Sequence, residues 1–341
     1  MTATPLDRPL LADSVRLTDR GVEILDRRVF PFERSWVVCP TVEDVAVAIE
    51  QMVTQSSGPL FAATAGFVLA TRSLAGATDP DHVRRELRRT AQRLIATRPT
   101  NNHIREGLAG AVAALDADLD AASLLDRAAA AAAGAADGYL ADCRALGAAT
   151  AAIIPDGARV LTHCWADSYL VETVMAGRAA GKSWEFVCTE TRPYLQGARL
   201  TGPSLVEMGV PTTLVTDGMV AETMRRGMVD VALTAADRVT MDGHVVNKVG
   251  TLAVALAARE FGLPFHAMVI EPDPAAPGID AVPIELRDPD EVLSVMGVRT
   301  AGEGLRGFYP AFDVTPPHLI TTVVTRRGAF APDKLIEGTP A

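Results

Sequence analysis

Two residues of the C-terminal half, Cys164 and Asp237, have the chemistry of an acid–base pair. Each ends a short apolar run, ARVLTHC for the cysteine and VDVALTAAD for the aspartate. A lone cysteine is more often a small buried apolar residue, and an aspartate often closes a turn. A cysteine that ends a strand beside His163 is favoured as a reactive thiol, and a carboxyl after an apolar run is expected to be desolvated, with a raised pKa. Facing one pocket, the two groups could transfer protons.

The elements that must position this pair are strands alternating with helices. We expect strands at 158–164, 184–190, 212–217, 229–237 and 264–270, and helices at 169–180, 202–208, 220–226 and 251–261. Nearly continuous apolar strands in this alternation predict a parallel sheet covered on both faces. Ligands bind beyond the carboxyl ends of such strands, so the polar groups there should lie along one edge. These groups are Thr162-His163-Cys164, Glu190-Thr191-Arg192, Thr216-Asp217 and Asp237-Arg238.

The preceding part of the chain has a different pattern. A short strand is expected near 22–25, and Thr41 is a fair N-cap for the helix that follows it. Further helices are expected at 60–74, 82–98, 104–119 and 121–149. The predicted fold class is therefore α/β, with a mainly helical N-terminal domain over 1–150 and a Rossmann-like parallel-sheet domain over 151–341.

Composition excludes several classes of function. The 341 residues carry a net charge of −10 and no Lys/Arg block, which argues against a nucleic-acid partner. No apolar stretch is long enough to span a membrane, and the N-terminus lacks the pattern of a signal peptide. The four cysteines form neither a CxxC pair nor a disulfide framework, so a reducing cytoplasm is expected.

Cofactor motifs are weak or missing. No GxGxxG follows the first strand, and the six histidines form no HxH or HExxH pattern, so neither NAD nor a metal is implied. The segment DGHVVNKVGT at 242–251 suggests a turn that delivers Asn247 and Lys248 to the start of a helix. A lysine and helix-start amides suit a phosphate or sugar oxygens, while a surface β-turn is an equally good interpretation of this segment alone.

Several longer motifs together resemble one known family. They are RPT at 98–100, THC at 162–164, ETRPYLQGARLT at 190–201, TDGM at 216–219, AADR at 235–238, NKVGT at 247–251, PIELRDPDEV at 283–292 and YPAFDVTPPHLI at 309–320. This combination resembles the methylthioribose-1-phosphate isomerases. Their superfamily includes ribose-1,5-bisphosphate isomerases and the regulatory subunits of eukaryotic translation initiation factor 2B. The resemblance covers nearly the whole chain.

The resemblance implies an aldose–ketose isomerase that acts on a ribose 1-phosphate. The family's catalytic cysteine falls on Cys164 and its catalytic aspartate on Asp237. Its substrate-binding residues fall on Arg98, Gln196, Asn247 and Lys248. The implied partners are a small sugar-phosphate substrate and, in a homodimer, a second copy of the chain. No cofactor is implied.

The family's chemistry explains these residue types. Because the anomeric oxygen carries phosphate, the sugar ring cannot open to a free aldehyde in the ordinary way. Asp237 would protonate the ring oxygen, and Cys164 would move a proton from C2 to C1. A hydride shift is the alternative considered for this family. Neither step needs a metal or a nicotinamide.

The chain departs from the family around the expected pocket. The family usually carries Val-Arg-Gly-Ala-Pro, whose arginine helps bind phosphate, where this chain reads VTQSSGP at 53–59. Ser56, Ser57 and Gly58 offer hydroxyls and amides there without the bidentate charge. Residues 165–167, Gly218 and Ala235 also differ from the family's usual residues.

These departures leave the substrate open. Methylthioribose 1-phosphate is the best single named substrate, and a paralogue that acts on 5-deoxyribose 1-phosphate or another modified sugar phosphate is the first alternative. A non-catalytic sensor of a sugar phosphate or nucleotide is the second, although retention of both Cys164 and Asp237 argues against it. Ribose 1,5-bisphosphate would need a second anion site, and no extra basic cluster supplies one.

Overall fold

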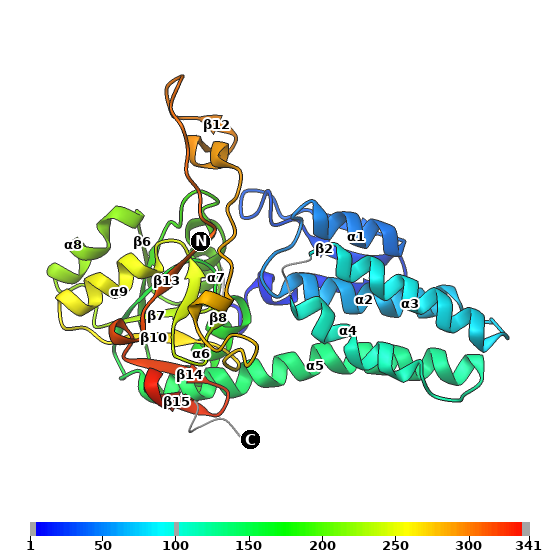
Figure 1. Cartoon of the computed structure of the whole chain (residues 1–341). Helices are drawn as coiled ribbons and strands as arrows, with labels where there is room; N and C mark the ends of the chain where they lie inside the picture. The colour runs from blue at the N-terminus through cyan, green and yellow to red at the C-terminus, as the bar shows by residue number, and fades with distance from the viewer. Residues whose placement is uncertain (1–4, 99–101, 336–341) are drawn as a thin grey trace. The chain divides into compact units, whose positions relative to one another are not determined.

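The protein is represented by a computed structural model that describes residues 5–98 and 102–335. It divides into two compact units, which we call the helical unit (Leu10–Ala141) and the sheet unit (Asp142–Ala341 with Met1–Pro9). The division falls inside helix α5, Ala121–Ile153 (Figure 1). Among the described residues, no helix combines the length and the apolar composition needed to cross a lipid bilayer.

The helical unit is built from amphipathic helices around one apolar core. Helices α1 (Val42–Glu50), α2 (Gly58–Ser73), α3 (Pro80–Ala96) and α4 (Asn102–Ala114) pack with the first part of α5. In α3 the buried residues Val83, Leu87, Ala91 and Leu94 recur at helical spacing, and the charged residues between them face outward. The predicted helices of this region are thus present, with bounds that differ by a few residues.

A small antiparallel sheet completes this unit. Its strands are β1 (Val15–Thr18), β2 (Gly21–Leu25) and β3 (Trp36–Cys39), in the order β1-β2-β3. The sequence predicted only the strand that corresponds to β2. Strands β1 and β3 were missed because they are four residues long and largely half-buried or exposed, so their apolar pattern is weak.

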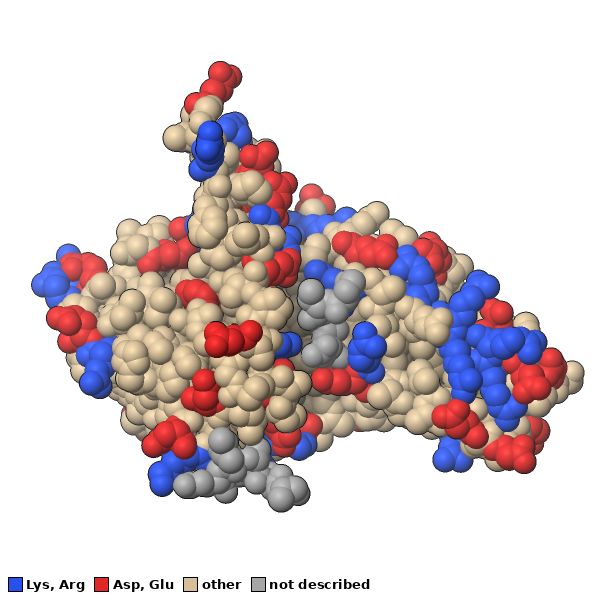
Figure 2. All heavy atoms as spheres, viewed as in Figure 1, with Lys and Arg blue, Asp and Glu red and all other residues tan. Residues whose placement is uncertain are grey.

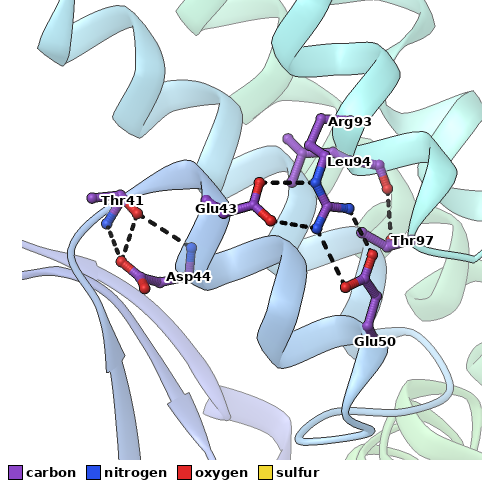
Figure 3. A network of polar contacts seen from close by, with 7 residues as sticks. All are labelled: Thr41, Glu43, Asp44, Glu50, Arg93, Leu94 and Thr97. Atoms are coloured by element: carbon purple, nitrogen blue, oxygen red, sulfur yellow. Dashed lines mark hydrogen bonds and ion pairs between the residues drawn. The ribbon is translucent and has the colours of Figure 1, made fainter.

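The start of α1 confirms the predicted cap. The Thr41 hydroxyl accepts the amide of Asp44 at 3.2 Å, and the Asp44 carboxylate accepts the amide of Thr41 at 3.1 Å. This reciprocal pair satisfies two amides that a helix N-terminus leaves without partners. Nearby, Arg93 of α3 holds Glu43 and Glu50 of α1 at 2.6 Å each, which joins the two helices across the surface (Figure 3).

The arginines of α3 form the densest group of positive charge in the sequence of this unit. Figure 2 shows blue and red side chains side by side over this helix. Arg84, Arg88 and Arg93 each lie within 2.9 Å of a carboxylate. Because acids pair with these arginines, the helix does not present the unbalanced positive face that a phosphate backbone needs.

The sheet unit is organised around a seven-stranded sheet. Its strands are β4 (Arg159–Thr162), β5 (Glu185–Thr189), β6 (Thr212–Val215), β7 (Val231–Ala235), β10 (Phe265–Met268), β14 (Thr322–Thr325) and β15 (Gly328–Phe330). The order is β15-β14-β10-β7-β4-β5-β6, and each neighbouring pair is parallel except β14 with β15. All five predicted strands are confirmed, and β14 and β15 were not foreseen.

Helices connect these strands and bury the sheet. They are α6 (Asp167–Ala179), α7 (Gly202–Glu207), α8 (Val220–Arg225) and α9 (Thr251–Glu260). Apolar residues of the sheet, including Leu161, Ala232 and Phe265, pack with Val254 and Ala258 of α9 in one core. A π-helical turn, Gly197–Thr201, runs directly into α7.

Two smaller antiparallel elements interrupt the alternation. Strands β8 (Arg238–Val239), β9 (Val245–Lys248) and β13 (Phe312–Thr315) form a sheet in the order β13-β9-β8. Strands β11 (Ser294–Val295) and β12 (Val298–Arg299) form a hairpin within a projecting segment, and Figure 1 shows a loop that extends beyond β12. Neither element was predicted from the sequence.

Candidate active site

Cys164 and Asp237 follow the two strands at which the direction of the sheet reverses. From β4 the chain continues outward to β5 and β6, and it then returns to the other side of β4 as β7 and β10. Ligands of open parallel sheets bind at such a switch point, beyond the carboxyl ends of the strands. Cys164 lies two residues after β4 and Asp237 two residues after β7, so both flank this point.

Hydrogen bonds join the carboxyl ends of β4, β5 and β6. The amide of Cys164 donates to the Thr191 hydroxyl at 3.0 Å, and the amides of Thr191 and Arg192 donate to the carboxylate of Asp217 at 2.8 and 2.7 Å. The ends of β4, β5 and β6 therefore meet at one edge, as expected. Asp217 serves as the anchor of the loop after β5.

The backbone of Cys164 is strained and held on both sides. Its φ is +65°, and Thr191 has φ +64°, in the left-handed region that costs a β-branched residue most. The Cys164 carbonyl accepts the hydroxyl of Thr201, the last residue of the π-helical turn. Two threonine hydroxyls thus satisfy both backbone polar groups of Cys164, which fixes the direction of its side chain.

The charges around the Cys164 thiol define its protonation state. Burial raises the pKa of this thiol to about 12, the Lys248 ammonium opposes that rise, and the carboxylates of Asp237 and Asp217 add to it. The thiol is therefore protonated near neutral pH.

Asp237 differs from its predicted environment. The sequence analysis expected a desolvated carboxyl, but the side chain is exposed, because the chain leaves the sheet directly after β7 and turns into β8. Its neighbour Arg238 pairs with Asp273 at 3.1 Å. The predicted burial of Asp237 is therefore wrong.

Asn247 and Lys248 are buried strand residues that follow a turn at 241–242 and precede helix α9, so the alternative of a surface β-turn is wrong. Both belong to β9. Asn247 donates to the Thr251 hydroxyl at 2.9 Å, and the Lys248 ammonium lies 4.9 Å from the ring centre of Phe312. The amide-to-carbonyl ladder with β13 holds both residues in register. A second turn follows β9 at 249–250, and Gly250, the N-cap residue of α9, adopts φ +111°.

Two amides at the start of α9 are occupied by a carboxylate. The Asp313 carboxylate accepts the amide of Gly250 at 2.7 Å and that of Leu252 at 3.1 Å. A carboxylate of β13 therefore already takes two of the helix-start amides that were predicted to act together with a lysine. Lys248 remains as the cation of this segment.

Gln196 precedes the π-helical turn in a tightly packed loop. A Cβ at Gly197 would lie 1.7 Å from the carbonyl oxygen of Thr189, so glycine is required after Gln196. The side-chain oxygen of Gln196 and the hydroxyl of Tyr194 are both buried without a hydrogen-bond partner in the described part of the chain. A ligand with hydroxyl groups can satisfy such atoms. π-helical turns occur frequently at functional sites.

The remaining predicted residues belong to the helical unit. Ser57 is the buried N-cap residue of α2, Gly58 begins that helix, and Ser56 is exposed with φ +56°. Arg98 follows α3, and its guanidinium contacts the sulfur of Met52. Residues 99–100 of the RPT motif lie outside the described residues.

Arg27 is a functional candidate that the sequence analysis did not identify. It is 1% exposed, and its guanidinium donates to the Gln55 carbonyl at 2.6 Å and to the Ser14 hydroxyl at 2.9 Å. It therefore fixes the loop that leads to Ser56 and Ser57. The available signal is the pair of arginines in LDRRVFP at 25–31.

A protein-family model, the Initiation factor 2 subunit family, matches residues 54–332. The chain belongs to this family. Among its relatives, the methylthioribose-1-phosphate isomerase of Pelotomaculum thermopropionicum is 36% identical, over 94% of this chain and 92% of that protein. The 5-deoxyribose 1-phosphate isomerase of Moorella thermoacetica is 39% identical, over 92% of this chain and 93% of that protein.

Solved structures of the family share the fold. The 5-methylthioribose 1-phosphate isomerase of Pyrococcus horikoshii OT3 superposes with a TM-score of 0.86 at 29% identity, covering 99% of this chain and 97% of that one. The delta subunit of translation initiation factor eIF-2B from A. fulgidus gives 0.85 at 30% identity, covering 95% and 97%. Similarity of fold therefore extends to relatives with different names, and the site residues must decide the function.

Proposed function

We propose that this family member is an aldose–ketose isomerase that converts a 5-substituted ribose 1-phosphate to the ribulose 1-phosphate. Methylthioribose 1-phosphate is the best single substrate, which would place the enzyme in methionine salvage. The observation that carries the proposal is a thiol and a carboxyl, Cys164 and Asp237, each two residues beyond the carboxyl end of a strand, on the two sides of the switch point of the sheet. The names of the relatives in both comparisons agree with it.

In this proposal Asp237 is the acid of ring opening. Its exposed carboxyl would become desolvated once the sugar covers it, and desolvation favours the protonated form that can donate to the ring oxygen. Asn247 and Gln196 would bind the sugar hydroxyls, and Lys248 would neutralise anionic charge on the substrate. Each of these groups acts without a metal or a nicotinamide.

Cys164 would move the proton from C2 to C1. Its high thiol pKa makes the thiolate scarce near neutral pH but strongly basic once formed, which suits removal of a proton from carbon. The test uses substrate with deuterium at C2. Exchange of the label with solvent water during turnover supports the thiol as a base, and full transfer of the label to C1 would instead indicate a hydride shift.

The substrate is tested with a panel of sugar phosphates. We expect the highest kcat/KM with methylthioribose 1-phosphate, and 5-deoxyribose 1-phosphate is the second candidate because one relative carries that name. Ribose 1,5-bisphosphate serves as the negative comparison. Absence of ketose formation from all three compounds would refute the isomerase proposal.

Each unit has its own predicted substrate-binding residues in place of the family's missing arginine. In the helical unit these are Ser56, Ser57 and Gly58, whose loop is held by Arg27, and the cation Arg98. In the sheet unit the predicted cation is Lys248. Replacing either cation, as Arg98→Met or Lys248→Met, should raise KM. Unchanged KM in both variants would contradict this assignment.

A non-catalytic sensor is the second candidate, and the catalytic pair separates it from an enzyme. Cys164→Ala and Asp237→Asn should each lower kcat by about 10²- to 10⁴-fold, the usual contribution of an acid or base. Both variants should still bind the sugar phosphate in calorimetry. Binding by the wild type without turnover would favour the sensor.

The setting of the enzyme completes the proposal. We infer a mainly helical N-terminal domain followed by a Rossmann-like catalytic domain, acting in the cytoplasm, where a catalytic thiol stays reduced.

We also infer a homodimer. The exposed apolar residues Met296, Val298 and Phe308 of the projecting segment support it, since a partner would remove them from water. Light scattering coupled to gel filtration tests the oligomeric state.

A further inference from the structure

The imidazole of His163 connects three separate segments of the sheet unit. Its Nδ1 lies 2.6 Å from the Thr189 hydroxyl at the end of β5, and its Nε2 lies 3.0 Å from the carbonyl oxygen of Val249 after β9. The residue itself follows β4 and is 3% exposed. Gly250 lies against the ring, where an added Cβ would be 2.7 Å from Cε1.

The partners of the ring determine which nitrogen carries the proton. A carbonyl oxygen can only accept, so Nε2 must carry the hydrogen that it donates to Val249. Burial lowers the pKa of His163, so the ring is neutral and its Nδ1 has no hydrogen. Nδ1 must therefore accept the hydroxyl hydrogen of Thr189.

This tautomer orients the next two hydroxyls. Because Thr189 donates to the ring, its contact with the Thr191 hydroxyl at 3.3 Å requires Thr191 to be the donor. The Thr191 oxygen in turn accepts the amide of Cys164 at 3.0 Å. A single directional chain results, from the Cys164 amide through two threonines and the imidazole to the Val249 carbonyl. Both threonines are fully buried, so water does not compete with it.

The chain of hydrogen bonds links the predicted base to the predicted substrate-binding strand. One end holds the backbone of Cys164 in its strained conformation, and the other end holds the residue next to Lys248. We propose that His163 is a positioning residue, whose Nε2–H tautomer sets the distance between the Cys164 thiol and the Lys248 ammonium. The proposal rests on the proposed isomerase function, and it adds a role for His163 and Thr189.

The proposal predicts an effect on kcat rather than on KM. Asn247 is anchored by Thr251, and Gly250 by Asp313, through contacts that do not involve the imidazole. The substrate-binding strand therefore keeps its shape when the chain is broken, while the strained thiol loses its alignment. A small misplacement of a reacting group costs rate in the chemical step more than affinity.

The decisive pair of variants is Thr189→Val and Thr189→Ser. Valine has the shape of threonine but cannot donate to Nδ1, and we expect a loss in kcat of about 10- to 100-fold with KM changed by less than about threefold. Serine keeps the donor and should restore most of the rate. All rates are normalised to folded enzyme, measured by circular dichroism, because a purely structural role would lower the folded fraction and leave kcat unchanged. Equal kcat in the wild type and in Thr189→Val overturns the proposal, as does a serine variant as slow as the valine variant.

The tautomer is tested independently of catalysis. Nitrogen-15 NMR of histidine-labelled protein should show one buried ring protonated at Nε2 only, and this signal should be absent in His163→Gln. A ring protonated at Nδ1, or a charged ring near neutral pH, overturns the proposal. Because the spectrum requires no turnover, it can fail while the isomerase function stands, and it can succeed if no isomerase activity is found.

Discussion

Replacing Gly250 with alanine tests the geometry of the site with a single methyl group. Gly250 adopts φ +111°, which costs a residue with a Cβ about 1–3 kcal/mol. The new Cβ would also lie 2.7 and 2.8 Å from two atoms of the His163 ring, which is held on both sides by hydrogen bonds and cannot retreat freely. Forcing such a contact in a packed core costs a further amount of about 1–3 kcal/mol.

The expected result for Gly250→Ala is therefore a loss of about 2–6 kcal/mol in the free energy of unfolding. Gly262→Ala is the control, because Gly262 also has a positive φ, +68°, but an added Cβ meets nothing within 4 Å. This control should lose only about 1–2 kcal/mol. Urea unfolding followed by circular dichroism measures both. Equal losses in the two variants would refute the close packing of Gly250 on His163.

Three further predictions concern the thiol, a helix cap and a buried histidine. At fixed pH, Asp237→Asn should speed alkylation of Cys164 and Lys248→Met should slow it, because the carboxylate raises the pKa of the thiol and the ammonium lowers it. Mass spectrometry of iodoacetamide-treated protein measures the alkylation rates. The reverse order of rates would contradict the electrostatic account. Thr41→Ala should cost about 1 kcal/mol of unfolding free energy and Thr41→Ser much less, since only the alanine removes the cap of α1. Equal urea midpoints for the two variants would argue against this role of the Thr41 hydroxyl. Burial lowers the pKa of His266 from 6.5 to about 4, so the unfolded chain takes up a proton before the folded chain does and stability falls as the pH drops through this window. Urea unfolding at neutral pH and at pH 4.5 measures the free energy of unfolding lost between the two. This loss should be smaller by about 2.5 kcal/mol in His266→Leu than in the wild type. An equal loss in the two proteins would exclude this histidine as the cause.

Secondary structure was predicted best from the sequence where apolar residues are continuous or recur at a regular spacing. Four of the five predicted parallel strands are mostly buried apolar runs, the edge strand β6 being the exception, and together with the rule for strand ends they placed Cys164, Thr191 and Asp217 along one edge. Burial on both faces makes such strands visible without any tertiary information. The helices of the helical unit were predicted from a different periodic pattern, the amphipathic spacing seen in α3.

The sequence was least informative where distant segments determine the environment. Strand β9 pairs with β13, more than 60 residues later, so Asn247 and Lys248 looked like part of a turn. Asp313 occupies the start of α9 from the same distant strand. The exposure of Asp237 and the reach of Arg27 to the Gln55 carbonyl likewise depend on tertiary structure. Local patterns do not carry this information.

The left-handed backbone of Cys164, Asp167, Thr191 and Leu195 has a consequence for attempts to make this protein more robust. Glycine is the residue best suited to such conformations, so substitutions that relieve strain would be found at and beside the proposed active site. Thr191 would be among the first positions chosen, yet its hydroxyl holds the amide of Cys164. Selection for thermal tolerance alone would therefore tend to remove the groups that direct the thiol, and a stabilised variant of this chain should be sought in the helical unit instead.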